Sequence, residues 1–161
     1  MKHFVIVLFT LSMLACSARK PSDAKVSVAS VTTVTYDSVL AKKLGADEYG
    51  MHAYVMAFLK KGPNREQDPE KAKLLQKAHL ENIGKLAEQG KLVVAGPFMD
   101  DGDLRGIYVF NVATVEEAKK LTETDPLIQS GGLVMELHPW YCTAGLVMVN
   151  EIHKKVAKVQ I

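Results

Sequence analysis

The order of strand-forming runs and helical periods along the chain constrains its fold more than any other sequence feature. Residues 52–59 are rich in strand formers and end at a Lys-Lys-Gly-Pro turn. Asp68 and Pro69 then provide a helix N-cap and a proline at the first helical position. From there to Gln89 apolar residues recur every three or four positions, and Gly90 ends the pattern. The first half of the domain is therefore predicted to be a strand followed by a long helix.

The second half of the domain begins with a hairpin and ends with a helix and a strand. Asp-rich turn residues separate two strand-like runs, and a Thr with a Glu three residues later forms a capping box. The predicted elements are strands at 91–98 and 104–112 around a turn at 100–103, a helix from Thr114 to Thr122 with its box residue Glu117, a short helical turn from Asp125-Pro126 to Gly131-Gly132, and a fourth strand at 133–138 stopped by Pro139.

This order is βαββαβ, and it predicts an α+β fold. Right-handed crossovers place both helices on one face of a four-stranded antiparallel sheet, which makes a ferredoxin-like βαββαβ sandwich. A tail from about Thr143 to Lys155 adds a C-terminal helix, with Val149, Ile152 and Val156 on one stripe.

Both faces of the predicted sheet are apolar. In the first strand Tyr54 and Phe58 point one way, whereas Val55 and Leu59 point the other way. Two helices cover only one face, and the other face would expose a large apolar patch to water. A second copy of the sheet would cover that face through a two-fold interface, so we expect a homodimer. The alternative cover is the C-terminal helix, folded back within the chain.

The N-terminus is predicted to be a targeting segment. The apolar run at 4–14 is about half the roughly 20 residues of a membrane-spanning helix, and it fits a secretory signal. Met13-Leu14-Ala15 before Cys16 resembles the lipobox of bacterial lipoproteins, which implies cleavage before Cys16 and a lipid on its sulfur. A plain secretory signal with a coincidental cysteine is the alternative. By analogy, Ser17 favours a lipid-anchored protein of the outer membrane, facing the periplasm, over the inner membrane.

These patterns divide the chain into four parts, which are a signal peptide at 1–15, a lipidated cysteine and tether with a short helix at 16–50, the α+β domain at 51–141 and a helical extension at 142–161. The tether is rich in Ser, Thr, Ala and Lys, and Asp37 caps its short helix, which Gly45 ends. We expect Cys142 to be buried or to pair between chains. A bridge from Cys142 to Cys16 would require an unmodified Cys16.

Composition excludes several classes of function. The chain has 20 Lys and Arg residues against 18 Asp and Glu residues, so no basic surplus suggests a nucleic-acid partner. The two cysteines cannot make a disulfide framework, and no Cys/His spacing matches a zinc site. The acidic turn at 100–103 lacks the glutamate of a calcium loop and is interpreted as a hairpin turn. We expect no metal and no cofactor.

Five short segments, in this order on a βαββαβ frame, resemble the YCII-related family over residues 52–141. The segments are Lys77-Ala78-His79-Leu80, Gly90-Lys91-Leu92-Val93-Val94-Ala95-Gly96-Pro97, Glu116-Glu117-Ala118, Thr124-Asp125-Pro126 and Pro139-Trp140. The resemblance implies a dimeric α+β barrel and a His–Asp active-site pair, which falls on His79 and Asp125. A few relatives are dehydrochlorinases that act on chlorinated aromatics. The secretory anchor and the appended helix depart from the family pattern.

The residues themselves allow two interpretations of this pair. His79 lies on the apolar stripe of the first helix with Leu75 and Leu86, so it points at the sheet. An imidazole exchanges protons near neutral pH, and a carboxylate on its far nitrogen would fix the tautomer. Alternatively, His79 is a hydrogen-bonded core residue and Asp125 is only the N-cap of the next helical turn.

A ligand would lie between the helices and the sheet, near the dimer contact, and we assign four further residues to substrate binding: Tyr54, Phe58, Pro97 and Trp140. Glu136 and His138 either line the second face of the sheet or mark its edge. The sequence thus predicts a small-molecule enzyme that uses a His–Asp pair for cofactor-free proton transfer, of the lyase or isomerase type. The alternative is a non-catalytic, lipid-anchored module that binds a ligand or a protein.

Overall fold

The computed structural model describes residues 35–159. The predicted signal segment, Cys16 and most of the tether lie outside the described residues. Among residues 35–159, no helix is both long and apolar enough to cross a membrane. The elements in chain order are α1 (Ser38–Lys43), β1 (Met51–Lys61), α2 (Pro69–Glu88), β2 (Leu92–Pro97), β3 (Leu104–Phe110), α3 (Val115–Thr122), α4 (Pro126–Gln129), β4 (Leu133–Thr143), the 3₁₀ helix η1 (Ala144–Met148) and α5 (Val149–Val156).

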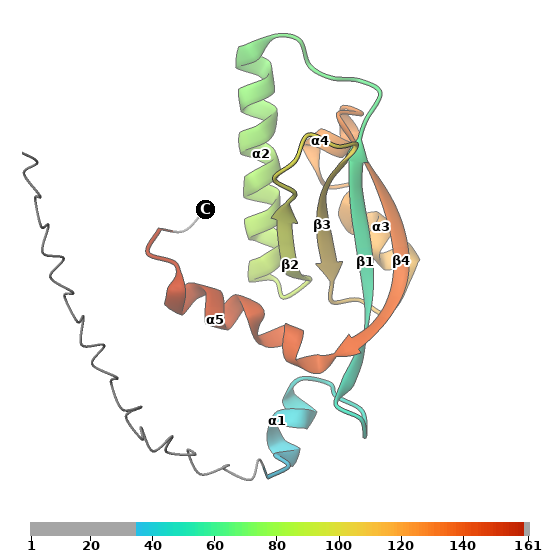
Figure 1. Ribbon diagram of the computed structural model, residues 1–161, viewed down its shortest axis with the longest axis vertical. Helices are drawn as coiled ribbons and strands as arrows, with labels where there is room; N and C mark the ends of the chain where they lie inside the picture. The colour runs from blue at the N-terminus through green and yellow to red at the C-terminus, as the bar shows by residue number, and fades with distance from the viewer. Residues whose placement is uncertain (1–34, 160–161) are drawn as a thin grey trace, which may run out of the picture. The chain divides into compact units, whose positions relative to one another are not determined.

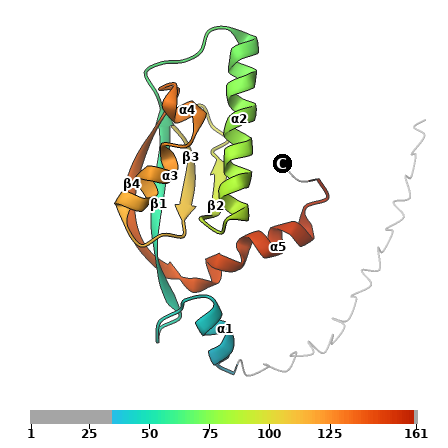
Figure 2. The same cartoon turned by 180° about the vertical axis from the view of Figure 1, so that it is seen from behind.

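The four strands form one antiparallel sheet in the order β2-β3-β1-β4 (Figure 1). With α2 and α3 as the crossovers, this is the ferredoxin-like α+β fold that the sequence predicts, and the added C-terminal helix is present as α5. Both crossover helices pack on the same face of the sheet (Figure 2). Their apolar residues Leu86 and Ala118 lie in one core with Val55 and Phe110 of the central strands.

Helices α2, α3 and α4 begin at the predicted capping residues, and α2 ends just before Gly90 as predicted. The Asp68 carboxylate accepts hydrogen bonds from the backbone N–H groups of Glu70 and Lys71 at the start of α2. Gly90 follows α2 with a φ of 67°, a left-handed conformation that favours glycine. Thr114 and Asp125 cap α3 and α4 through their side chains. Local chemistry therefore sets these helix boundaries.

The predicted end of the fourth strand at Pro139 is wrong. Strand β4 continues through Pro139, which pairs with Val55, and ends at Thr143. A proline lacks the N–H group that a central strand must donate, but β4 is an edge strand with only one neighbour. The missing donor can therefore face away from the sheet. The longer strand carries Trp140 and Cys142 alongside Tyr54 and His52 of β1.

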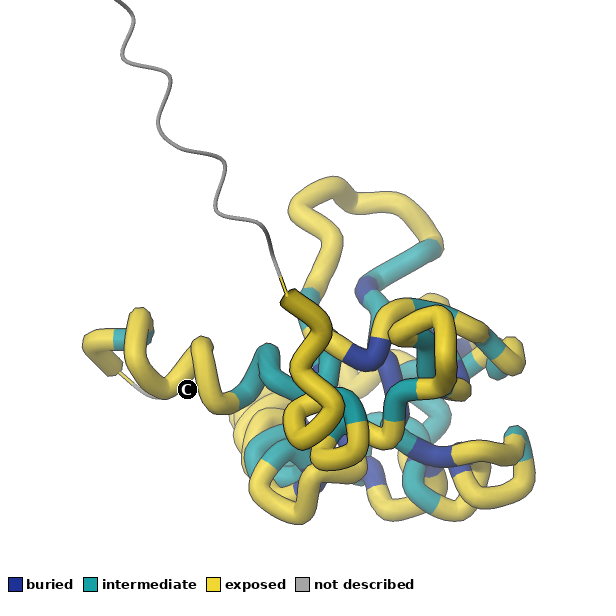
Figure 3. Tube along the Cα trace, turned by 90° about the horizontal axis from the view of Figure 1, so that it is seen from below, coloured by how far each residue is buried: buried dark blue, intermediate teal, exposed yellow. Residues whose placement is uncertain are grey.

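The second face of the sheet is covered in part by the chain itself. Tyr54, Val93 and Val109 form a buried cluster there, and Leu146 and Val147 of η1 pack against it. The predicted tail helix therefore starts as a 3₁₀ turn that lies on the sheet before α5 begins. Figure 3 shows the buried residues inside the body of sheet and helices, whereas α5 has no buried residue. The Phe58 end of this face stays half-exposed.

Candidate active site

His79 and Asp125 lie in direct contact beneath the helix layer. His79 projects from α2 toward the sheet with 7% of its surface exposed, and Asp125 is 1% exposed just before α4. The distance between His79 Nδ1 and an Asp125 carboxylate oxygen, Oδ2, is 2.7 Å. The structure therefore brings together two side chains that are 46 residues apart in the sequence.

The Asp125 carboxylate fills both of the roles that the sequence leaves open. One oxygen, Oδ1, accepts a hydrogen bond of 2.9 Å from the backbone N–H of Leu127 and so caps α4. The other oxygen faces the imidazole of His79. Pro126 fixes the first backbone angle of α4, which holds this carboxylate in place. The N-cap and the histidine partner are thus one residue.

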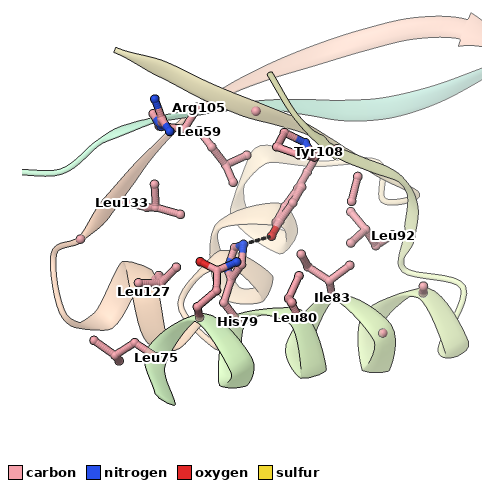
Figure 4. Close-up of a pocket in the computed structure, with 18 of the residues that line it drawn as sticks. Leu59, Leu75, His79, Leu80, Ile83, Leu92, Arg105, Tyr108, Leu127 and Leu133 are labelled. Atoms are coloured by element: carbon pink, nitrogen blue, oxygen red, sulfur yellow. Dashed lines mark hydrogen bonds between the residues drawn. The ribbon is translucent and has the colours of Figure 1, made fainter. Parts of the chain in front are cut away.

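This contact fixes the tautomer of His79. An ionised carboxylate only accepts hydrogen bonds, so Nδ1 carries the proton and donates it to Asp125. The other ring nitrogen, Nε2, is then an acceptor, and it faces the hydroxyl of Tyr108 at 3.4 Å. The two rings lie nearly parallel, with 21° between their planes. The nitrogen that can take a proton therefore points toward the sheet (Figure 4).

Tyr108 is a candidate functional residue that the sequence analysis does not assign. Burial raises the pKa of its hydroxyl, and the negative charge of Asp125 raises this pKa further. The hydroxyl therefore remains protonated at neutral pH and can donate a hydrogen bond to Nε2 of His79 or to a ligand. The alternation of β3 contains a signal for this position, because Tyr108 falls on the face opposite Ile107 and Val109, where the helices pack.

A cavity of about 1200 Å³ lies between α2 and the sheet. His79 and Tyr108 line it from opposite sides, as Figure 4 shows. Most of its other inner side chains are apolar, which makes it suited to a small organic ligand. These include Leu59, Leu75, Ile83, Leu92, Leu127 and Leu133.

Of the four residues assigned to substrate binding, only Pro97 lines this cavity. Tyr54, Phe58 and Trp140 lie on the other face of the sheet, so the structure does not bring them to His79. Tyr54 and Trp140 pack there with a ring distance of 6.3 Å, and Phe58 contacts His138. The strand alternation that places them together is correct, but the cavity lies on the opposite side.

The remaining polar candidates make local contacts. Glu136 binds both Lys60 and His138 on the second face, and these bonds lower the pKa of its carboxyl. The Asp100 carboxylate accepts the backbone N–H of Gly102, as expected of a hairpin turn. Within the described part of the chain, no three His, Cys, Asp or Glu side chains are grouped to hold a metal ion. Cys142 is half-buried on the second face.

Three comparisons with known proteins place the chain among its relatives. The sequence profile of the YCII-related domain matches residues 53–141, which is more than half of the chain. No protein with a curated description matches the chain. A similar solved structure is 5-chloro-2-hydroxyhydroquinone dehydrochlorinase from Burkholderia phenoliruptrix AC1100, in complex with 2,5-dihydroxybenzoquinone. It is 20% identical with a TM-score of 0.40, and the match covers 55% of this chain and 92% of that one.

Proposed function

The chain belongs to the YCII-related domain family, and on this premise we propose that it is a small-molecule enzyme in which His79 and Asp125 transfer a proton without a cofactor. The reaction would be an elimination or an isomerisation, of the lyase or isomerase type. The observation that carries the proposal is the 2.7 Å contact between the two buried side chains beside a cavity.

In the proposed reaction each group has a role that fits its position. Nε2 of His79 is the base, because Nδ1 is held by Asp125. The carboxylate orients the ring and stabilises the imidazolium that forms when Nε2 takes a proton. Tyr108, which stays protonated, donates a hydrogen bond to a substrate oxygen as negative charge develops there. His79 then returns the proton to the product or to the leaving group.

A purely structural histidine would have a different environment. A core histidine has both ring nitrogens satisfied and is enclosed by neighbouring side chains. His79 has one short bond to a carboxylate, but the contact on Nε2 is 3.4 Å long and lies at the wall of a large cavity. Catalytic hydrogen bonds are often long without substrate and shorten when it binds. The arrangement therefore supports a reactive role for His79.

Hydrogen–deuterium exchange of carbon acids tests this proposal directly. The protein is incubated in D₂O with a panel of small oxo compounds and chlorinated hydroxyaromatics, and loss of C–H signals is followed by proton NMR. We expect catalysed exchange for at least one compound and a loss of about 100-fold or more in His79→Gln. His138→Gln, on the other face of the sheet, is the matched control and should retain the full rate.

Equal rates in His79→Gln and the unchanged protein would contradict the enzyme proposal. A protein that binds panel compounds but exchanges none of them favours the alternative, a non-catalytic module that binds a ligand or a protein.

For both functions we propose that Cys16 carries a lipid anchor in the bacterial cell envelope.

We also propose that the protein is a homodimer through the second face of the sheet. The half-buried Phe58 and Ile107 lie there, beyond the part that η1 covers. Sedimentation velocity is expected to give about twice the monomer mass, and Phe58→Asp is expected to give a monomer. Leu74→Asp places the same charge at an exposed apolar position on α2 and should stay dimeric. A monomeric unchanged protein would contradict the dimer.

A further inference from the structure

The cavity beside His79 has a cationic rim at one end. Lys61, Arg65 and Arg105 line it where β1 leaves the sheet and β3 begins. The inner walls are mostly apolar, and His79 and Tyr108 face each other across them. A ligand in this space would thus meet an apolar wall, a base and a set of positive charges.

A β-bulge directs Arg105 to this rim. Leu59 of β1 pairs with Gly106, whereas its neighbour Lys60 pairs with Leu104, so Arg105 is an extra residue in β3. Strict alternation would place Arg105 with Ile107 on the second face, opposite to Tyr108. A bulge breaks that alternation and turns the side chain. Arg105 accordingly lines the same cavity as Tyr108, and Figure 4 shows it beside Leu59.

The Arg105 guanidinium is hydrogen-bonded to the backbone of the hairpin turn. Its Nη1 donates to the backbone carbonyl of Gly102 at 3.2 Å and to that of Asp100 at 3.5 Å. Arg105 is half-buried, and within residues 35–159 no carboxylate forms an ion pair with it. A guanidinium has five N–H donors, so Nη2 and Nε are left for a ligand. The turn thus positions the guanidinium through backbone carbonyls, without a direct ion pair.

The acidic side chain on this rim does not provide the missing counter-charge. Glu66 lines the cavity, but its Oε1 accepts the backbone N–H groups of Gln67 at 2.9 Å and Asp68 at 3.0 Å. At the opposite end of the cavity, Lys154 of α5 faces the same space as Glu88, so the two charges there have opposite signs. Among the residues that line the cavity, the surplus of positive charge is therefore at the Arg105 end.

We propose that the cavity binds an organic carboxylate, with its anionic group on Arg105 and its apolar body along α2 beside His79. A planar carboxylate matches the fork of N–H donors on a guanidinium, and the apolar walls suit an aromatic or aliphatic body. The inference rests on the proposed function, because His79 is taken to act on a part of the ligand that lies away from the carboxylate.

Two probes of the same shape and different charge test the inference. Binding of 2-naphthoate and of neutral 2-naphthamide to the purified protein is measured by calorimetry, and shifts of the Tyr108 ring signals locate the probe. We expect naphthoate to bind about tenfold more tightly than naphthamide, and Arg105→Gln to remove this preference. Lys119→Gln makes the same charge change at an exposed site on α3 and should keep the preference.

Equal affinities for the two probes, or an unchanged preference in Arg105→Gln, would overturn the inference. Absence of saturable naphthoate binding at millimolar concentration would also overturn it. His79→Gln changes the wall beside the apolar body of both probes alike, so it should keep the preference for naphthoate over naphthamide. The carbon-acid exchange described above depends on His79, so failure of the carboxylate site and failure of the proposed reaction give different results.

Discussion

Asp125→Asn is expected to leave the protein folded while moving the ring proton of His79 from Nδ1 to Nε2. The backbone N–H of Leu127 still needs an acceptor, so the amide oxygen of Asn takes the capping position. The amide NH₂ group then faces Nδ1 of His79, which must accept instead of donate. Nε2 becomes protonated and can no longer act as a base. We expect the rate of the carbon-acid exchange that the protein catalyses to fall by about a thousandfold.

Nitrogen chemical shifts of the imidazole measure this tautomer without any substrate. The unchanged protein should show a protonated Nδ1, and Asp125→Asn should show a protonated Nε2. The free energy of unfolding should fall by only about 1 kcal/mol, because one charge-assisted hydrogen bond becomes a neutral one. Asp68→Asn, which changes the N-cap of α2 in the same way, is the control and should leave the His79 tautomer unchanged. A protonated Nδ1 in Asp125→Asn would contradict the geometry of the pair.

Gly62→Ala is expected to lower the free energy of unfolding by about 3 kcal/mol. A Cβ atom at Gly62 would lie 2.1 Å from the carbonyl oxygen of Gly131 and 2.7 Å from the carbonyl carbon of Gly132. Both contacts are with backbone, which cannot move aside as a flexible side chain would. Two hydrogen bonds join these segments, from Gly62 N–H to Gly132 and from Asn64 N–H to Gly131, and a shift would break them.

Gly84→Ala provides a matched comparison for this experiment. Gly84 lies within α2, and a Cβ atom there would meet nothing within 4 Å. Alanine is the better helix former, so this variant should be more stable by about 0.5 to 1 kcal/mol. Urea unfolding of both variants gives the two values. A Gly62→Ala variant as stable as Gly84→Ala would show that the two backbone segments do not approach as described.

Local signals in the sequence predict the fold because they act within a few residues. Asp68, Thr114 and Asp125 cap helices through contacts with the next three residues. Gly90 adopts a positive φ because it has no side chain to oppose it. The hairpin and the strand alternation are also local. The prediction at Pro139 is wrong because the effect of a proline on a strand is not local. It depends on whether the strand has one neighbour or two, and only the assembled sheet decides that.

The candidate site is predicted only in part, because its parts meet through long-range packing. The pairing of His79 with Asp125 comes from the family resemblance and not from the spacing of the residues. Tyr108 is identifiable by alternation, but its contact with His79 depends on how far α2 lies from the sheet. The turn of Arg105 toward the cavity depends on a register shift between β1 and β3, which no local pattern in the sequence signals.

The Asp125 carboxylate both caps α4 and holds the ring of His79, so the orientation of this ring depends on α4 staying folded. Helix α4 has only four residues, and a helix of this length has no stability apart from its cap and its packing. Whenever this turn opens locally, the imidazole loses its anchor and both ring tautomers become accessible. The rate of deuterium exchange at the Leu127 amide thus reports how often α4 opens and His79 loses its hydrogen bond to Asp125.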